Sequence, residues 1–443
     1  MPSVTQEWPP WPEFTSPDSL DGKDSSLLSM KKAIIAEYGA DTLRQSWIKV
    51  CNELQAVTDE IVEKGNEIIP IFDTSQILAD GFTESDQAEV KRIGAFICRS
   101  TIPEDETNTL YDDMSKYVSD NKASIQAWPK ESPSMLILYS SPIQNTIRSH
   151  PSQLGLQLKL NELWHGYDAS EGTSPDPLAY FDGLRDRAPG QPFLGLGPHI
   201  DAGSLSRWAD PAYRKVYDNV FRGNPEKHDS FDISLRKDAD PALYKATAHS
   251  SVLRTFQGWT ALTPTQPREG TIMVYPNLNS VIAYVLLRPF FQPPKEKDAD
   301  ILDPHAWTLS EEDSWFPGTF KSQSQRLSRA SHPHLRLEEC LVHMPKVNAG
   351  DTVWWHCDVC HAVDTEHLGK RNAAVAFIGS CPTTPVNSDY IRRQLEATLA
   401  GRPPPDYATG DDTDADETKM KGYVGLDGLS SAARGAFGFD KPN

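Results

Sequence analysis

The sequence predicts an α+β fold in which a helical N-terminal region precedes a β-rich core. Residues 27–65 place apolar side chains at steps of three and four, which is the spacing of one buried helix face. This stripe consists of Leu43, Trp47, Val50, Leu54, Val57 and Ile61. Residues 252–262 and 353–361 are instead rich in β-branched and aromatic residues, which favour strands. The chain therefore combines a helical start with strands that are expected to carry a site.

The other elements follow from local signals along the chain. Gly65 is expected to end the first helix, and Gly94 marks the change from a second helix to a strand. The predicted helices are 83–96, 103–117, 154–164, part of 205–222, and 390–399, where prolines 403–405 end the last one. The predicted strands are 68–72, 94–99, 135–139, 252–262 with 271–275 as its hairpin partner, and 373–378.

The expected organisation is one large domain between two peripheral segments. Residues 289–345 are rich in proline, serine and charge, which is typical of an insertion between core strands, either a lid or a surface excursion. The predicted parts are an irregular arm at 1–25, a single domain at 26–405 and an acidic tail at 406–443. Within the domain, a helical part covers about 26–130 and the core about 131–385. The acidic run at 411–417 is expected to be solvated.

Composition excludes several classes of partner. The chain has 43 lysines and arginines against 62 acidic residues, a net charge of −19, and no basic cluster. Nucleic acid and anionic membranes are therefore not expected as partners, which leaves a small molecule and an open oligomeric state. The apolar run at 281–287 is too short to span a bilayer. Six scattered cysteines and no secretory signal in residues 1–14 predict a cytoplasmic protein.

Three residues from distant segments have the chemistry of a metal site. His199 and Asp201 are two positions apart, so on a strand both side chains point to the same face. A strand over 353–361 would end at His361. Two imidazoles and one carboxylate form the facial triad of non-haem Fe(II) oxygenases, which leaves coordination positions open. His356 is the competing ligand, and on a straight strand it would face away from His361.

The stretch Cys357-Asp358-Val359-Cys360-His361 also matches the spacing of c-type haem attachment, and its two cysteines could suggest a zinc pair. On an extended strand Cys357 and Cys360 would point to opposite faces, and the chain has no second cysteine pair. Neither haem nor zinc is therefore the favoured interpretation.

Taken together, these motifs resemble known oxygenases. His199, Asp201, His361 and the following Arg371 are similar to the double-stranded β-helix enzymes that use Fe(II) and 2-oxoglutarate. Five segments also resemble the bacterial and fungal Gig2-like family: 180–190, 197–208, 254–262, 288–291 and 346–371. The resemblance covers most of residues 60–405 and implies a jelly-roll, cupin-like core with flanking helices.

The resemblance also implies roles for the residues. His199, Asp201 and His361 would hold iron, with 2-oxoglutarate and dioxygen as co-substrates. A planar guanidinium binds the far carboxylate of 2-oxoglutarate in bidentate fashion, and Arg371 is the candidate, with Arg185 and Arg187 as alternatives. Trp259 and Gln257 are expected in the substrate pocket, although Trp259 could equally be core. Tyr180 and Trp208 complete the expected lining of the pocket.

The expected function is hydroxylation of a C–H bond in a small molecule by an Fe(II)/2-oxoglutarate-dependent dioxygenase. An aromatic lining with few basic groups beyond Arg371 favours a flat apolar substrate. Some fungal oxygenases that this sequence resembles oxidise ring methyl groups of aromatic polyketides, so the resemblance implies, as the narrowest expectation, a benzylic methyl group of a fungal aromatic polyketide. The alternatives are an oxygenase of a primary metabolite and a non-catalytic metal-binding or sensing module on the same barrel.

Overall fold

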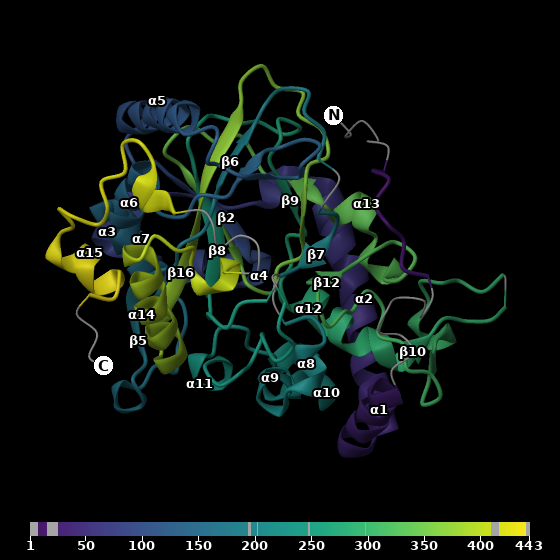
Figure 1. The fold of residues 1–443 in the computed structure, drawn as a ribbon. Coiled ribbons are helices and arrows are strands. Elements are labelled where there is room, and N and C mark those ends of the chain that lie inside the picture. The colour runs from purple at the N-terminus through teal and green to yellow at the C-terminus, as the bar shows by residue number, and fades with distance from the viewer. Residues whose placement is uncertain are drawn as a thin grey trace.

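The computed structural model describes residues 8–15, 25–193, 196–201, 203–246, 249–296, 298–408 and 416–439. Within them, helices flank two β-sheets on opposite sides (Figure 1). The helices are α1 Ser25–Tyr38, α2 Ala40–Lys64, α3 Thr74–Asp80, α4 Glu84–Ile93, α5 Glu104–Asp120, α6 Pro142–Ser149, α7 Pro151–Asn161, α8 Ser206–Ala209, α9 Pro211–Val216, α10 Asp218–Phe221, α11 Ile233–Arg236, α12 Asn279–Leu287, α13 Leu337–Cys340, α14 Pro385–Leu399 and α15 Ser431–Ala436.

The large sheet joins strands from most of the chain. Among the described residues it has nine strands, in the order β1-β2-β14-β8-β16-β6-β4-β3, with β5 also pairing with β16. They are β1 Ile71–Asp73, β2 Ala95–Arg99, β3 Ala127–Trp128, β4 Met135–Leu136, β5 Ser174–Ala179, β6 Leu184–Arg187, β8 Phe256–Ala261, β14 Thr352–His356 and β16 Ala373–Thr383. Helices α7 and α14 pack on β5 and β16 and cover one side of this sheet (Figure 1).

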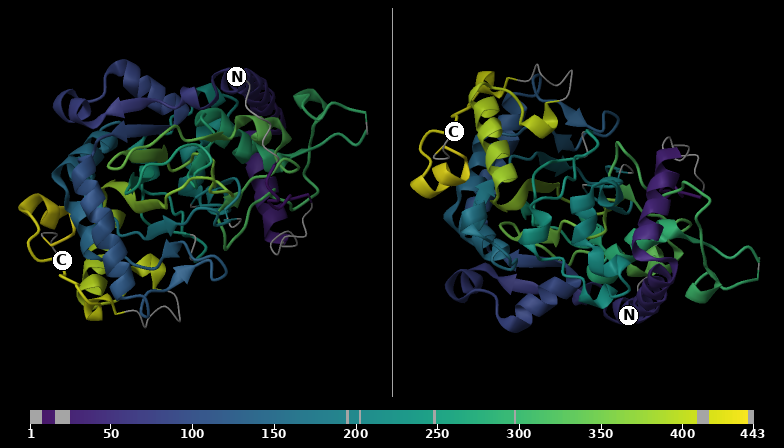
Figure 2. Two further views of the ribbon diagram at one scale, coloured as in Figure 1. Left: turned by 90° about the horizontal axis from the view of Figure 1, so that it is seen from above. Right: turned by 90° about the horizontal axis from the view of Figure 1, so that it is seen from below.

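The small sheet carries part of the predicted site. Its order is β12-β7-β15-β9-β13, and every neighbouring pair is antiparallel. The strands are β7 His199–Ile200, β9 Ile272–Val274, β12 Gln325–Arg326, β13 Val342–His343 and β15 His361–Val363. A separate ribbon pairs β10 Phe291–Gln292 with β11 Thr308–Leu309. The views from above and below show the strands in the middle of the molecule with helices around them (Figure 2).

The predicted N-terminal helix is two helices, because Gly39 interrupts it with a positive φ of 90° that disfavours other residues. The apolar stripe lies on α2 and is buried along its whole length. Trp47 is fully buried and stacks on Phe291, with ring centroids 4.6 Å apart. Gly65 ends the helix as predicted. This stripe is therefore core, and α2 packs against α12 on the far side of the small sheet.

The predicted hairpin between 252–262 and 271–275 is wrong. Both strands form, but β8 pairs with β14 and β16, whereas β9 pairs with β15 and β13 in the other sheet. The connection contains Pro264 and Pro267, whose rings cannot donate backbone hydrogen bonds to a continuing ladder. The chain therefore crosses from one sheet to the other here, and it crosses again between β14 and β15.

Two segments that were expected to be peripheral contribute to the body of the protein. Residues 289–345 supply β12 and β13, the two edge strands of the small sheet. In the tail, Glu417 is buried and accepts hydrogen bonds from the backbone N–H groups of Tyr139 and Ser140, so this end of the predicted acidic run is not solvated. Residues 411–415 of that run lie outside the described residues. Among the described residues, no helix combines the length and the apolar character needed to cross a bilayer.

Gly258 on β8 provides a test of how tightly the large sheet is packed. A Cβ at this position would lie 2.5 Å from the carbonyl oxygen of Val353 and 2.6 Å from the Trp354 ring. Because β14 is held between two strands, Gly258→Ala should lower the free energy of unfolding by about 1–3 kcal/mol in chemical denaturation. Gly435→Ala is the matched control, since nothing lies within 4 Å of its new Cβ in α15. Equal effects of the two variants would contradict this packing.

Candidate metal centre

His199 and His361 are direct partners across two strands. The antiparallel pairing of β7 with β15 places the two residues opposite each other, with ring centroids 4.2 Å apart. Asp201 follows β7, and its carboxylate oxygens lie 3.5 Å from His199 Nε2 and 3.4 Å from His361 Nε2. Both rings are almost fully buried, whereas the Asp201 side chain is 30% exposed. The structure therefore brings the three predicted ligands together with their ligand atoms facing one another.

Backbone carbonyls contact the same nitrogen, Nδ1, in both rings, so Nε2 of each ring faces Asp201. His199 Nδ1 lies 2.8 Å from the carbonyl oxygen of Gly197, and His361 Nδ1 lies 3.1 Å from that of Val359. A carbonyl accepts a hydrogen bond, so each Nδ1 carries the proton and each Nε2 presents a lone pair toward Asp201. This is the tautomer that a metal-binding imidazole needs.

The charges agree with this arrangement. Burial, assisted by the neighbouring His361, lowers the pKa of His199 to about 3, so its ring is neutral near pH 7. Burial alone would raise the pKa of Asp201, but His199 and His361 outweigh it and hold that pKa well below its ordinary value. A neutral imidazole beside an ionised carboxylate is the ligand state that divalent cations bind. The donor set therefore fits the 2-His-1-carboxylate triad of non-haem iron sites.

The three ligands lie at one wall of a cavity of about 270 Å³ between the two sheets. Gln257 reaches across from β8, and its Nε2 donates a 2.8 Å hydrogen bond to Asp201 Oδ2. The apolar part of the lining comes from both sheets and the segments beside them: Met135, Phe193, Leu196, Trp259, Ile272, Trp355, Val363, Val375, Phe377 and Ile378. The cavity is thus mostly apolar, with a small number of polar and charged side chains in its lining, as in many small-molecule sites.

Gln257 and Trp259 line this cavity, but Tyr180 and Trp208 do not. The Tyr180 hydroxyl donates to Asp406 Oδ2, and its ring lies in a separate cluster with Tyr390. Trp208 is fully buried on α8, and its Nε1 donates to the carbonyl of Leu286. The placement of these two side chains in the substrate pocket is therefore corrected. Each has an aromatic ring that packs in the core, which is the commoner fate of such residues.

The three candidate arginines lie in different environments, and only one of them lines the cavity. Arg371 is exposed on the loop before β16 and lies in a different surface hollow with Lys346 and His367, so its expected position in the co-substrate pocket is corrected. That loop runs over the surface, and apolar residues of β16 face the cavity instead. The Arg187 guanidinium donates hydrogen bonds to backbone carbonyls, from Nη1 to Asp364 at 2.6 Å and from Nη2 to Thr365 at 2.9 Å. Arg185 alone lines the cavity.

Two further arginines line the cavity without having been predicted. Arg254 lies within the predicted strand 252–262, two residues before the observed β8 begins, so its position near Gln257 and Trp259 could have indicated it. Arg326 lies opposite His199 in the pairing of β12 with β7. It belongs to the segment that was predicted to be an insertion, and no local pattern in the sequence points to it.

His356 is not part of the triad. It ends β14 in the large sheet, whereas His361 begins β15 in the small one, and a turn separates them. The expected single extended strand over 353–361 is therefore wrong. The His356 ring stacks on Trp164 with centroids 5.0 Å apart, and its Nε2 lies 3.2 Å from the carbonyl oxygen of Ser230.

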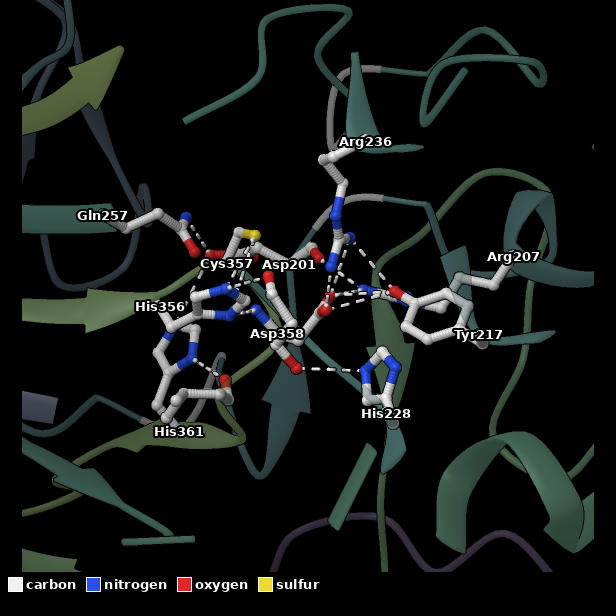
Figure 3. A network of polar contacts seen from close by, with 12 residues as sticks. Asp201, Arg207, Tyr217, His228, Arg236, Gln257, His356, Cys357, Asp358 and His361 are labelled. Atoms are coloured by element: carbon white, nitrogen blue, oxygen red, sulfur yellow. Dashed lines mark hydrogen bonds and ion pairs between the residues drawn. The ribbon is translucent and has the colours of Figure 1, made fainter. Parts of the chain in front are cut away.

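The turn between β14 and β15 is fastened by buried charges (Figure 3). Asp358 has no exposed side-chain surface, and its carboxylate lies 2.5 Å from Arg236 Nη2 and 3.5 Å from Arg207 Nη2. The same Arg207 nitrogen donates a 3.1 Å hydrogen bond to the backbone carbonyl of Asp201. The Tyr217 hydroxyl adds a contact of 3.1 Å to Asp358. Arg207 thus connects the segment before His361 to the segment that carries Asp201.

Comparisons with known proteins agree over nearly the whole chain. The family model described as Gig2-like matches residues 23–439. The YbiU protein of Escherichia coli K12 is 28% identical over 96% of this chain and 99% of its own length. The crystal structure of GlcNAc Inducible Gene 2 from Candida albicans has a TM-score of 0.85 at 25% identity, covering 97% of this chain and 92% of that one. A Salmonella typhimurium LT2 protein provisionally named an oxidoreductase has a TM-score of 0.79 at 27% identity, covering 96% and 99%.

The buried pairs of Asp358 give a prediction with a defined pH dependence. Burial alone would raise the pKa of this carboxyl, but Arg236 and Arg207 outweigh it and hold the pKa well below the ordinary value. Asp358→Asn should cost about 3–5 kcal/mol of unfolding free energy at pH 7, because it leaves buried guanidinium groups without their counter-charge.

The sign of the pH effect follows from linkage. A depressed folded-state pKa stabilises the protein above the unfolded pKa of about 3.9, and this contribution declines as the pH falls below that value. In urea unfolding, the difference in unfolding free energy between the wild type and Asp358→Asn should therefore be constant from about pH 5 to 7, a range that lies above the ordinary aspartate pKa. The difference should shrink in more acidic solution. A difference that grows in acid would contradict the assignment. Asp389→Asn, at an exposed carboxylate of α14, is the control.

Proposed function

This chain belongs to the Gig2-like family, and we propose that it is an Fe(II)/2-oxoglutarate-dependent dioxygenase that oxidises a C–H bond of a small molecule. The observation that carries the proposal is the meeting of His199, Asp201 and His361 at the wall of a largely apolar cavity. The oxidoreductase name given provisionally to the Salmonella relative supports the same reaction class. The arrangement of the two sheets around the cavity supports the proposed double-stranded β-helix core.

The donor set determines which metal chemistry is available. Three protein ligands leave coordination positions for a co-substrate and dioxygen, and a 2-His-1-carboxylate set is the one that non-haem Fe(II) oxygenases use. When bound, Fe(II) would supply dioxygen activation coupled to the oxidative decarboxylation of 2-oxoglutarate to succinate and carbon dioxide.

The protein's own residues orient the ligands and exclude water. Gln257 holds one carboxylate oxygen of Asp201 through its 2.8 Å hydrogen bond, which fixes the carboxylate orientation. Both imidazoles are fixed by backbone carbonyls. Trp259, Ile272 and Phe377 line the cavity on opposite sheets and would hold an apolar part of the substrate away from solvent.

Arg185 is the best candidate for binding the far carboxylate of 2-oxoglutarate. Its side chain is 5% exposed, and its Nε and Nη2 are buried without a hydrogen-bond partner among the described residues. The guanidinium lies over the Phe193 ring, 4.8 Å from the centroid, which fixes its plane. Unsatisfied buried donors are costly, and two adjacent ones match the bidentate geometry of a carboxylate.

Removal of any one ligand should abolish metal binding. His199→Ala, Asp201→Ala and His361→Ala should each weaken Fe(II) binding by more than the tenfold to hundredfold that outer contacts to a metal site contribute, as measured by equilibrium dialysis under anaerobic conditions. Exposed His305→Ala and the double variant Cys357→Ser/Cys360→Ser should retain the metal. The ligand assignment fails if His361→Ala keeps iron while His356→Ala loses it.

Turnover distinguishes an enzyme from a non-catalytic metal module. The wild type should release succinate from 2-oxoglutarate in an Fe(II)- and oxygen-dependent manner, and a metabolite extract should stimulate this release. A protein that binds iron but never consumes 2-oxoglutarate under either condition would instead be the sensing module.

Arg185→Gln should raise the dissociation constant for 2-oxoglutarate about tenfold or more, because a charge-assisted bidentate contact is lost, while Fe(II) binding stays unchanged. Isothermal titration calorimetry of the metal-free protein with Fe(II) and of the iron-loaded protein with 2-oxoglutarate, both under anaerobic conditions, measures the two quantities. Arg371→Gln is the matched control and should have no effect, since Arg371 lies outside the cavity. The reverse result would return the carboxylate site to Arg371.

The narrower expectation, a benzylic methyl group of an aromatic polyketide, stays a prediction. Trp259 still supports it, whereas Tyr180 and Trp208 no longer do, because they lie outside the cavity. Incubation of the enzyme with methylated phenolic ketones and aldehydes, followed by mass spectrometry, tests this expectation. Oxidation of sugars, amino acids or nucleosides in place of these compounds would overturn it.

A further inference from the structure

Three arginine side chains face the cavity without an acceptor of their own. Arg185 lies on β6, Arg254 precedes β8 and Arg326 lies on β12. Arg185 is buried, and its Nε and Nη2 have no hydrogen-bond partner, whereas Arg254 and Arg326 are partly exposed and form no hydrogen bond or ion pair with a described residue. A guanidinium has five N–H donors, and at a cavity wall without a protein acceptor these donors remain available to a ligand. Such groups therefore indicate a ligand that supplies acceptors.

The three arginines stand on different walls. Arg185 pairs with Val375 of the large sheet, whereas Arg326 lies in the small sheet opposite the metal ligand His199. Arg254 lies over the Tyr180 ring, 5.2 Å from its centroid, three residues before the Gln257 that contacts Asp201. The negative charge of Asp201 favours the charged form of both Arg254 and Arg326. The charges that act on Arg185 are those of Arg187 and Asp364, so Arg254 and Arg326 form a pair that is separate from Arg185.

The formal charges of the cavity lining also indicate an anionic ligand. The acidic residues among the lining side chains are Asp182 and Asp201. Asp182 already accepts a 2.8 Å hydrogen bond from the Tyr407 hydroxyl, and Asp201 belongs to the metal site. With a divalent metal and dianionic 2-oxoglutarate in place, the formal charges of the lining still leave one positive charge uncompensated. This surplus sits in a protein whose net charge is −19, so the general composition does not account for it.

We propose that the substrate is itself an anion, a carboxylate or phosphate on an apolar skeleton, and that Arg254 and Arg326 bind its charged group. This inference rests on the proposed function, because it assigns Arg185 to 2-oxoglutarate. Trp259, Ile272 and Phe377 supply the apolar surface for the skeleton. The expectation that few basic groups would be available beyond Arg371 is thereby replaced by an anion subsite near the triad.

The first test uses the wild-type protein loaded anaerobically with Fe(II) and 2-oxoglutarate. Phenylacetate, phenyl phosphate and neutral phenylacetamide are titrated separately by isothermal titration calorimetry. At least one anion should bind about tenfold or more tightly than the amide, as expected for gaining a charge-assisted contact, and the preferred anion distinguishes carboxylate from phosphate recognition. The absence of any preference for an anion would overturn the inference.

The second test locates the subsite. Arg254→Gln and Arg326→Gln should each weaken binding of the preferred anion about tenfold, leave phenylacetamide unaffected and change 2-oxoglutarate binding much less. Arg392→Gln, at an exposed arginine of α14 paired with Asp389, is the matched control. If the two arginines only balance the charge of Asp201, the variants will change Fe(II) affinity and leave anion binding intact, which overturns the assignment.

The two proposals fail in different ways. If the wild type binds neither Fe(II) nor 2-oxoglutarate but still prefers the anions through Arg254 and Arg326, the dioxygenase proposal fails and the anion subsite stands. If Fe(II) and 2-oxoglutarate bind normally and the anions bind no better than the amide, only the substrate inference fails. Where a variant does not fold, the comparison of the anions with phenylacetamide on the wild type still tests whether the substrate is an anion.

Discussion

The pairing of β7 with β15 is the interaction on which the site depends. It places His199 opposite His361, although the two residues are far apart in the sequence, and backbone carbonyls orient both rings. Strand pairing fixes the distance between the two backbones to within a few tenths of an ångström, because the ladder spacing is nearly constant. Asp201 needs only to follow β7 directly for its carboxylate to face both imidazoles. The geometry of the candidate metal site therefore follows from the antiparallel pairing of two short strands.

Short strands alone would hold this pair weakly, and buried polar contacts reinforce it from two directions. Arg207 connects the turn at Asp358 to the backbone of Asp201, so the two segments that carry the ligands are bound to one charge network. Gln257 reaches Asp201 from the large sheet and fixes the spacing across the cavity. Breaking a buried charge pair is far costlier than losing a surface one, so these contacts resist displacement of the ligands.

The cavity between the sheets combines two environments. The apolar walls lower the local polarity of the cavity, which strengthens electrostatic interactions inside it. Arg185, Arg254 and Arg326 add positive charge at three positions around the same space, in a chain that is otherwise strongly acidic. This composition is what the two proposals together require, in which a metal, an anionic co-substrate and an anionic substrate would share the cavity.

The sequence by itself determined the elements that depend on local pattern. The stripe from Leu43 to Ile61, the end of that helix at Gly65 and the spacing of His199 and Asp201 were all readable, because helix and strand periodicities are properties of neighbouring residues. The tertiary structure alone decided which strand pairs with which, so the hairpin of β8 with β9 and the single strand ending at His361 were mispredicted. It also decided which arginine faces inward. Arg371 lies on a surface loop and Arg326 on an edge strand beside His199, and no local pattern encodes the distance from either residue to the cavity.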